Sequence, residues 1–206
     1  MAHTFSLCGV ILAAGESSRM GRDKALLAWP PGESGHGTFL SATIRSLMAS
    51  CDQVIVVCGE NESQIAPVVY SEGAALVRNP APSEGQFSSL RIGLGEVLQR
   101  GRDAAIVTLV DRPPASRETV AQLVEAFDAA MKSGKWAAVP EHEGRHGHPI
   151  VIGREMMEAL LRAPATTNAR EVEHAHQEKM AYVTVADPFV TMNVNTPADY
   201  NKLAAR

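Results

Sequence analysis

The hydrophobic positions along the chain alternate between short continuous runs and longer segments with helical spacing. Continuous apolar runs are typical of strands buried on both faces, and they lie at 6–13, 54–57, 75–77 and 104–110. Helical spacing covers 38–50 and 88–100, and Asn61 and Ser116 are candidate N-caps for two further helices. Repeated strand–helix units predict an α/β fold with a mostly parallel sheet and helices on both of its faces.

Beyond residue 139 the alternation becomes less regular. The strands expected around and after this point are 136–139, 148–152, 180–185 and 191–194. A helix is expected at 154–162, and Thr196 is a candidate N-cap for a last helix with Pro197 at its first position. The chain has 206 residues and no internal repeat, so we treat residues 1–206 as a single domain with room for a sizeable core.

The segment from Val10 to Lys24 carries the strongest candidate chemistry. An apolar strand runs into a turn of small residues at Gly15, and Arg19 and Lys24 follow on the same loop. Exposed backbone N–H groups beside paired cations form a site for polyphosphate. The loop has neither the Gly-Lys-Ser/Thr ending of a Walker A motif nor the Gly-x-Gly-x-x-Gly pattern of a dinucleotide turn. The nucleotide-contacting residues predicted here are Leu12, Ala13, Ala14, Gly15, Arg19 and Lys24.

Three further polar features lie at or after predicted strand ends, at Gly85–Ser89, at Asp111 and at Asn193–Asn195. Ligands of such sheets bind at the carboxyl ends of the strands, so these features and the first loop are expected in one site. Asp111 comes directly after a buried strand, and a carboxylate there suits Mg²⁺, which prefers oxygen ligands. Both cations are predicted to bind phosphate. Lys24 would do so through its compact ammonium charge, and Arg19 through its planar guanidinium, which can contact two oxygens.

Together these motifs resemble those of the molybdenum-cofactor nucleotidyltransferases. The order Leu-Ala-Ala-Gly, x-x-x, Arg-Met-Gly, x-x, Lys is similar to the signature loop of that family. Further segments similar to family motifs are 109–113 (Asp-x-Pro), 85–94 (Gly-x-x-Ser-Ser-Leu-x-x-Gly-Leu), 144–149 (Gly-Arg-x-Gly-x-Pro) and 193–200 (Asn-x-Asn-Thr-Pro-x-Asp). The resemblance implies a three-layer α/β/α Rossmann-like nucleotidyltransferase fold with a mostly parallel, mixed sheet.

The resemblance also implies roles for individual residues. Lys24 and Arg19 are the expected catalytic residues, and Asp111 the expected Mg²⁺ ligand, completed by Asn195 as first choice or Asn193 as second. Additional nucleotide-binding residues are expected at Arg78, Asn79, Ser88 and Ser89. The two serines are expected to begin a helix, with their hydroxyls facing the nucleotide. The acceptor is expected against Arg145, Gly147, His148 and Pro149.

The reaction that this resemblance favours is transfer of CMP from CTP to the phosphate of molybdenum-bearing molybdopterin, with release of pyrophosphate. The second alanine of Leu-Ala-Ala-Gly narrows the space beside the base and favours CTP over GTP, whereas the asparagine pair at 193 and 195 is nearer the guanylyl branch. A guanylyltransferase of the same pathway and a sugar-phosphate nucleotidyltransferase remain alternatives. A non-catalytic nucleotide sensor or molybdoenzyme chaperone is the alternative from another class. Besides the nucleotide and a pterin phosphate, a molybdoenzyme or its chaperone is a candidate partner.

Composition narrows the remaining function classes. The net charge of −4 argues against general nucleic-acid binding, which favours a broad basic surface. Three cysteines without a Cys-x-x-Cys pair indicate reduced thiols, and with neither a signal peptide nor a membrane-spanning run the expected compartment is the cytoplasm. Two His-x-His pairs, at 146/148 and 174/176, raise zinc as a competing and less favoured hypothesis.

Overall fold

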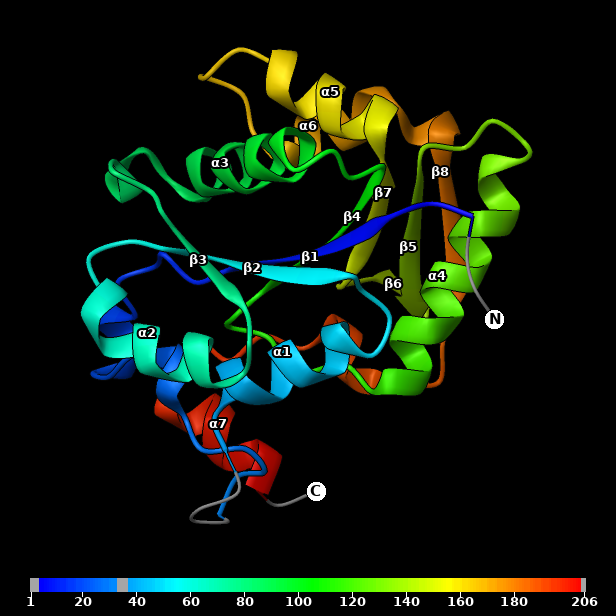
Figure 1. The fold of residues 1–206 in the computed structure, drawn as a ribbon. Coiled ribbons are helices and arrows are strands. Elements are labelled where there is room, and N and C mark those ends of the chain that lie inside the picture. The colour runs from blue at the N-terminus through cyan, green and yellow to red at the C-terminus, as the bar shows by residue number, and fades with distance from the viewer. Residues whose placement is uncertain (1–3, 33–36, 205–206) are drawn as a thin grey trace.

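The computed structural model describes residues 4–32 and 37–204, which build a central eight-stranded sheet between two layers of helices (Figure 1). The strands are β1 (Leu7–Leu12), β2 (Gln53–Cys58), β3 (Ala75–Arg78), β4 (Ala104–Leu109), β5 (Ala137–His142), β6 (Arg145–His146), β7 (Ile150–Gly153) and β8 (Met180–Thr184). They are ordered β3-β2-β1-β4-β7-β5-β6, and β8 pairs with β5. Strands β1 to β4 run parallel, whereas β7 is antiparallel to both β4 and β5. The predicted α/β class and the mixed, mostly parallel sheet are confirmed.

The helices that cover the sheet are α1 (Phe39–Met48), α2 (Glu62–Ser71), α3 (Gln86–Gln99), α4 (Arg117–Met131), α5 (Arg154–Arg162) and α6 (Ala169–Ala175). One core cluster packs α1, α2 and α4 on one face of the sheet, and a second packs α3, α5 and α6 on the other. Helix α7 (Pro197–Ala204) lies beyond α1, where Tyr200 packs against Phe39 (Figure 1). No helix in the described residues combines the length and apolar character needed to cross a membrane.

Strand β1 is buried along its whole length because helices pack on both of its faces. Gly93 shows how close that packing is: a Cβ atom there would lie 2.7 Å from Val10 Cγ1. A glycine inside a helix costs about 1 kcal/mol relative to alanine. Here it lets α3 sit directly on β1 and β2, which positions the loop that precedes α3 beside the end of β1.

Several predicted elements differ from the structure. The strand predicted at 191–194 is absent. Pro188–Thr191 is a 3₁₀ turn, and Val194 N–H donates to the Asp111 carbonyl at the sheet edge. Helix α3 begins at Gln86, two residues before the predicted start. Helix α6 was not predicted, because Val172 is its only buried residue and leaves no apolar period to detect.

Candidate active site

The loop that follows β1 presents free backbone donors at the carboxyl edge of the sheet. The backbone N–H groups of residues 14–17 donate to no residue that the structure describes. Ser17 has a left-handed backbone with φ 52°, and its hydroxyl accepts from Lys24 N–H at 3.1 Å, which folds the loop back on itself. A cavity of about 340 Å³ is lined by Ala14, Gly15, Glu16, Ser17, Ser18, Arg19, Lys24, Pro82 and Asn195. Consecutive N–H groups in such a loop make a concave site for an anion.

Asn61 and Asp23 hold this loop in place. We expected Asn61 to cap α2, but its side chain makes no capping bond. Instead its Nδ2 donates to the Ala13 carbonyl at 2.9 Å and to Asp23 Oδ2 at 2.6 Å. Ala13 is buried, and its own N–H donates to the Val57 carbonyl. Both backbone groups of Ala13 are thus engaged within the protein, so the anion-facing part of the loop begins at Ala14.

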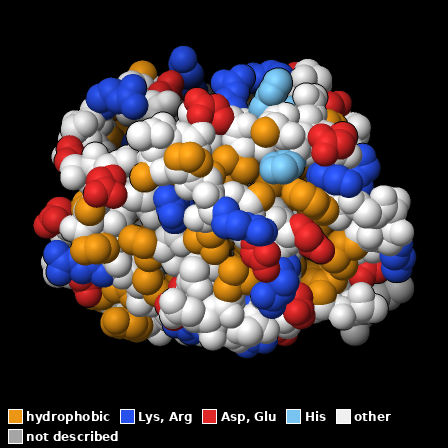
Figure 2. Space-filling model, turned by 90° about the horizontal axis from the view of Figure 1, so that it is seen from above, with side chains coloured by type: hydrophobic (Ala, Val, Ile, Leu, Met, Phe, Trp, Pro, Cys, Tyr) orange, Lys and Arg blue, Asp and Glu red, His pale blue; other side chains and the backbone are white. Residues whose placement is uncertain are grey.

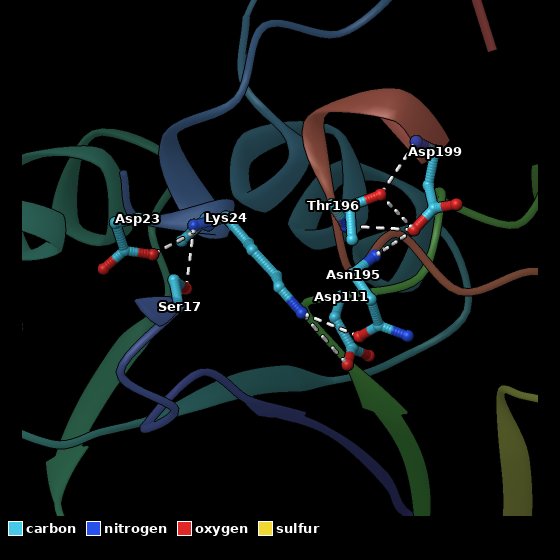
Figure 3. A network of polar contacts seen from close by, with 8 residues as sticks. Ser17, Asp23, Lys24, Asp111, Asn195, Thr196 and Asp199 are labelled. Carbon is cyan, nitrogen blue, oxygen red and sulfur yellow. Dashed lines mark hydrogen bonds and ion pairs between the residues drawn. The ribbon is translucent and has the colours of Figure 1, made fainter. Parts of the chain in front are cut away.

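Lys24, Asp111 and Asn195 meet at the centre of the site (Figure 3). The Lys24 ammonium donates to Asn195 Oδ1 at 3.1 Å and lies 3.6 Å from Asp111 Oδ2. Lys24 is only 9% exposed, so its charge is shielded from bulk water and acts strongly on neighbouring groups. Arg19 is exposed on the rim of the smaller cavity and makes no hydrogen bond or ion pair with the described residues. The structure thus brings together three of the four predicted features, whereas Gly85–Ser89 lines the larger cavity described below through its first three residues.

The peptide that carries Asn195 is fixed by Asp199 of α7. Asp199 Oδ2 accepts from Asn195 N, Thr196 N and Thr196 Oγ1 at 3.1, 2.9 and 2.9 Å (Figure 3). These bonds hold the pKa of Asp199 below its ordinary value. The bond from the Thr196 hydroxyl has the largest effect. Asn193, the second-choice metal ligand, is exposed and makes no hydrogen bond with the described residues. The geometry therefore favours Asn195.

The oxygens at this centre suit a magnesium ion. Asp111 Oδ1 is buried and has no hydrogen-bond partner among the described residues, and Asn195 supplies an amide oxygen that contacts the same Lys24 ammonium as Asp111 Oδ2. Mg²⁺ is commonly held by one or two carboxylates together with substrate phosphates. Nowhere in residues 4–32 and 37–204 do three His, Cys, Asp or Glu side chains gather as metal ligands, and His146 stacks on Tyr182, so the geometry gives zinc no support.

The residues predicted to contact the base have local partners instead. The Asn79 amide donates to Ser88 Oγ at 2.8 Å and Ser89 Oγ at 2.9 Å, and its oxygen accepts from Ala81 N–H. The two hydroxyls therefore fasten the loop before α3, and their contact with a nucleotide stays a prediction. Arg78 ends β3 with its charge 3.7 Å from Glu62. These four residues line neither the smaller cavity nor the larger one described next.

A larger cavity of about 960 Å³ lies between the sheet and helices α3, α5 and α6. Of the predicted acceptor residues, Arg145, Gly147 and His148 line it, whereas Pro149 is buried outside its lining. Figure 2 shows hydrophobic side chains together with Lys, Arg and His on the face that carries α3, α5 and α6. The cavity thus combines apolar walls with a few cationic groups, which is the usual make-up of a small-molecule site.

Arg112 is a site residue that the sequence analysis missed. It lines the larger cavity directly after Asp111, donates through Nη1 to the Val190 carbonyl at 3.1 Å, and has a buried Nε without a partner among the described residues. Burial lowers the pKa of Arg112, yet a guanidinium stays charged at neutral pH. Burial also lowers the pKa of His148 to about 3, so that imidazole is neutral. Arg112, Arg145 and Arg170, rather than His148, supply positive charge here.

Glycine is required at position 147, between β6 and β7, because the chain packs there against the backbone of Val190. A Cβ atom at Gly147 would lie 2.0 Å from the Val190 carbonyl oxygen, a backbone atom that also accepts from His148 N–H. We expect Gly147→Ala to lower the free energy of unfolding by about 1–3 kcal/mol, because such overpacking must displace backbone. Gly95→Ala is the matched control, since a Cβ atom there meets nothing within 4 Å, and it should leave stability unchanged or higher. Urea unfolding of both variants measures the difference, and equal midpoints would contradict it.

Comparisons with known proteins agree with this geometry. A probable molybdenum cofactor guanylyltransferase of Mycolicibacterium paratuberculosis is 29% identical over 99% of this chain and 98% of its own length. The molybdenum cofactor cytidylyltransferase of Escherichia coli is 23% identical over 93% of this chain and 92% of its own. The crystal structure of Rv0371c from Mycobacterium tuberculosis superposes with a TM-score of 0.78 at 25% identity, covering 98% and 99% of the two chains. A structure of that protein in complex with manganese gives a TM-score of 0.75.

The comparison with protein families identifies the family to which the chain belongs. The family described as MobA-like NTP transferase domain matches residues 9–180, which include the first loop, Asp111 and the segment from Arg145 to His148. This match covers most of the chain. The chain therefore belongs to the MobA-like NTP transferase family, a family of nucleotidyltransferases.

Proposed function

We propose that the protein transfers CMP from CTP to the phosphate of molybdopterin bearing molybdenum. The observation that carries this proposal is the meeting of Lys24 with Asp111 and Asn195, directly beside the free N–H groups of residues 14–17. Such a site offers a cation, metal-binding oxygens and an anion-binding loop at one edge of the sheet. The larger cavity, which is lined by Arg112, Arg145 and Arg170, supports a separate binding place for the acceptor.

The chemistry needs no general base if the acceptor is a phosphomonoester. The second pKa of such a phosphate lies near 6, so it is largely dianionic at neutral pH. The obstacle is the approach of two anions, which positioning and charge neutralisation overcome. Lys24 and Arg19 stabilise charge on the α-phosphate and on the departing pyrophosphate. Asp111 and Asn195 would hold Mg²⁺, which when bound neutralises and orients the triphosphate.

The choice of base is the finer part of the proposal. Ala14 lines the smaller cavity, and its methyl group takes space that a purine needs beside the loop. We expect Ala14→Gly to raise the ratio of GTP to CTP turnover by about tenfold, the scale of one methyl group in a pocket. Competition between the two triphosphates in one reaction measures the ratio directly. Ala175→Gly, an exposed position on α6 outside both cavities, serves as the control, and an unchanged ratio in Ala14→Gly would contradict this reason for CTP preference.

The test of the function is pyrophosphate release with each triphosphate, with and without molybdenum-loaded molybdopterin. We expect release only with CTP and the loaded pterin. Guanylyl transfer is the second candidate, favoured by the names of relatives such as that of Mycolicibacterium paratuberculosis and by Asn193 and Asn195. Release with GTP alone would establish it. Release only with a sugar phosphate, or triphosphate binding without any release, would overturn both.

A further inference from the structure

The larger cavity has two arginines at one end, whereas Glu173 and a third arginine, Arg170, reach it from helix α6 at the opposite edge of the sheet. Arg112 and Arg145 follow the carboxyl ends of β4 and β5. Glu173 lies on α6, which precedes β8, and β8 runs parallel to β5 with Met180 opposite Ala137. Glu173 therefore enters the cavity from the amino edge, where β5 and β8 begin. All four side chains line the same cavity.

The floor between these two ends is apolar. It is formed by the side chains of Val107, Leu109, Val139, Ile150, Ile152 and Met180. A flat ligand with a charged tail fits such a surface better than a compact polar one, because the floor between the ends offers few hydrogen bonds.

Glu173 is not accounted for by the fold. Its carboxylate makes no hydrogen bond or ion pair with any described residue, whereas Glu171 on the same helix bonds to the N-cap residue Asn168. Burial raises the pKa of Glu173, opposed by the charge of Arg170. A carboxylate that faces a cavity without a protein partner costs stability unless a ligand pairs with it.

We propose that Glu173 binds the donor edge of a 2-amino-4-oxo nitrogen heterocycle whose phosphate lies against Arg112 and Arg145. This rests on the proposed function, and it identifies the part of the acceptor that Glu173 recognises. An ionised carboxylate only accepts hydrogen bonds, so its partner must donate. The ring N–H and the amino group of a pterin form a paired donor edge, which a carboxylate can engage with two parallel bonds as it does a guanidinium. A sugar phosphate has no such edge.

The test compares two ring systems that differ at this edge. Pterin carries the 2-amino group, whereas lumazine carries a carbonyl there and is otherwise alike. We expect the protein to bind pterin at least about tenfold more tightly than lumazine, as measured by quenching of ring fluorescence. Glu173→Gln should remove this preference. Glu125→Gln, on the exposed face of α4 and without a hydrogen bond or ion pair to the described residues, should keep it.

The outcomes separate this proposal from the proposed function. Equal binding of the two rings, no binding of either, or a preference that survives in Glu173→Gln would overturn the role of Glu173. Pyrophosphate release with loaded molybdopterin would in that case still support CMP transfer. A pterin preference lost in Glu173→Gln, without pyrophosphate release under any condition, would support Glu173 and overturn the transferase assignment. In the active enzyme, Glu173→Gln should raise the KM of the acceptor while leaving the KM of CTP unchanged.

Discussion

Replacing Lys24 by Ala is expected to lower turnover by at least about 100-fold while leaving the fold intact, a loss of ~2.7 kcal/mol in the barrier. The buried ammonium contacts both Asn195 and Asp111, and among the described residues only Lys24 and the exposed Arg19 bring a cation to the lining of the smaller cavity. Charge that develops on the transferred phosphate would then be met by Arg19, by backbone N–H groups and by Mg²⁺ where it is bound, without the Lys24 ammonium. Steady-state release of pyrophosphate measures the loss, and thermal unfolding measures the fold.

Two companion variants make this result specific. Lys24→Met keeps the length of the side chain without its charge and should lose as much turnover as Lys24→Ala. Lys132→Ala removes a lysine of equal charge from α4, where its ammonium pairs with Asp128 at 2.9 Å and is mostly exposed. Turnover of Lys132→Ala should match that of the unaltered protein. Near-normal turnover in Lys24→Ala would refute the role of the ammonium in the reaction.

The sequence was most informative where one physical requirement dominated. Strand β1 is an apolar run because both of its faces are covered, and α5 appears at 154–162 as predicted because its apolar period is clear. Lys24, Asp111 and Asn195 could be grouped in advance because each follows a strand or lies near a sheet edge where ligands bind. Helix α6 could not be found, since it is short and mostly polar.

The sequence could not assign a role where polar side chains have two possible partners. Ser88, Ser89 and Asn79 suit a nucleotide by type, and in the structure they also bind one another and so hold the loop before α3. Short polar side chains commonly satisfy nearby groups in this way. Arg112 and Glu173 were missed for a different reason. A single arginine or glutamate forms no sequence motif with a recognisable spacing. Only the cavity that both residues line shows that they are placed for a ligand.

Replacing Asp111 by Asn should lower turnover by at least about 100-fold and raise the half-saturating Mg²⁺ concentration at least about tenfold. The amide keeps the shape of the side chain but has one oxygen and no negative charge. Asp111 Oδ1 is buried without a partner among the described residues, so no structural hydrogen bond is lost with it. We therefore expect the free energy of unfolding to change by less than about 1 kcal/mol. Turnover as a function of Mg²⁺, with Asp128→Asn on α4 as the control, measures both effects.

The double variant Lys24→Ala/Asp111→Asn decides whether these side chains act as a unit. If the ammonium and the carboxylate serve the same bound triphosphate, removing either one disables most of the arrangement. The loss in the double variant should then fall well short of the product of the two single losses. Independent sites would instead give multiplied losses, as would two residues that act in separate steps. An unchanged Mg²⁺ response in Asp111→Asn, together with multiplied losses, would show that the metal is held elsewhere and that the 3.6 Å contact between Lys24 and Asp111 is only structural.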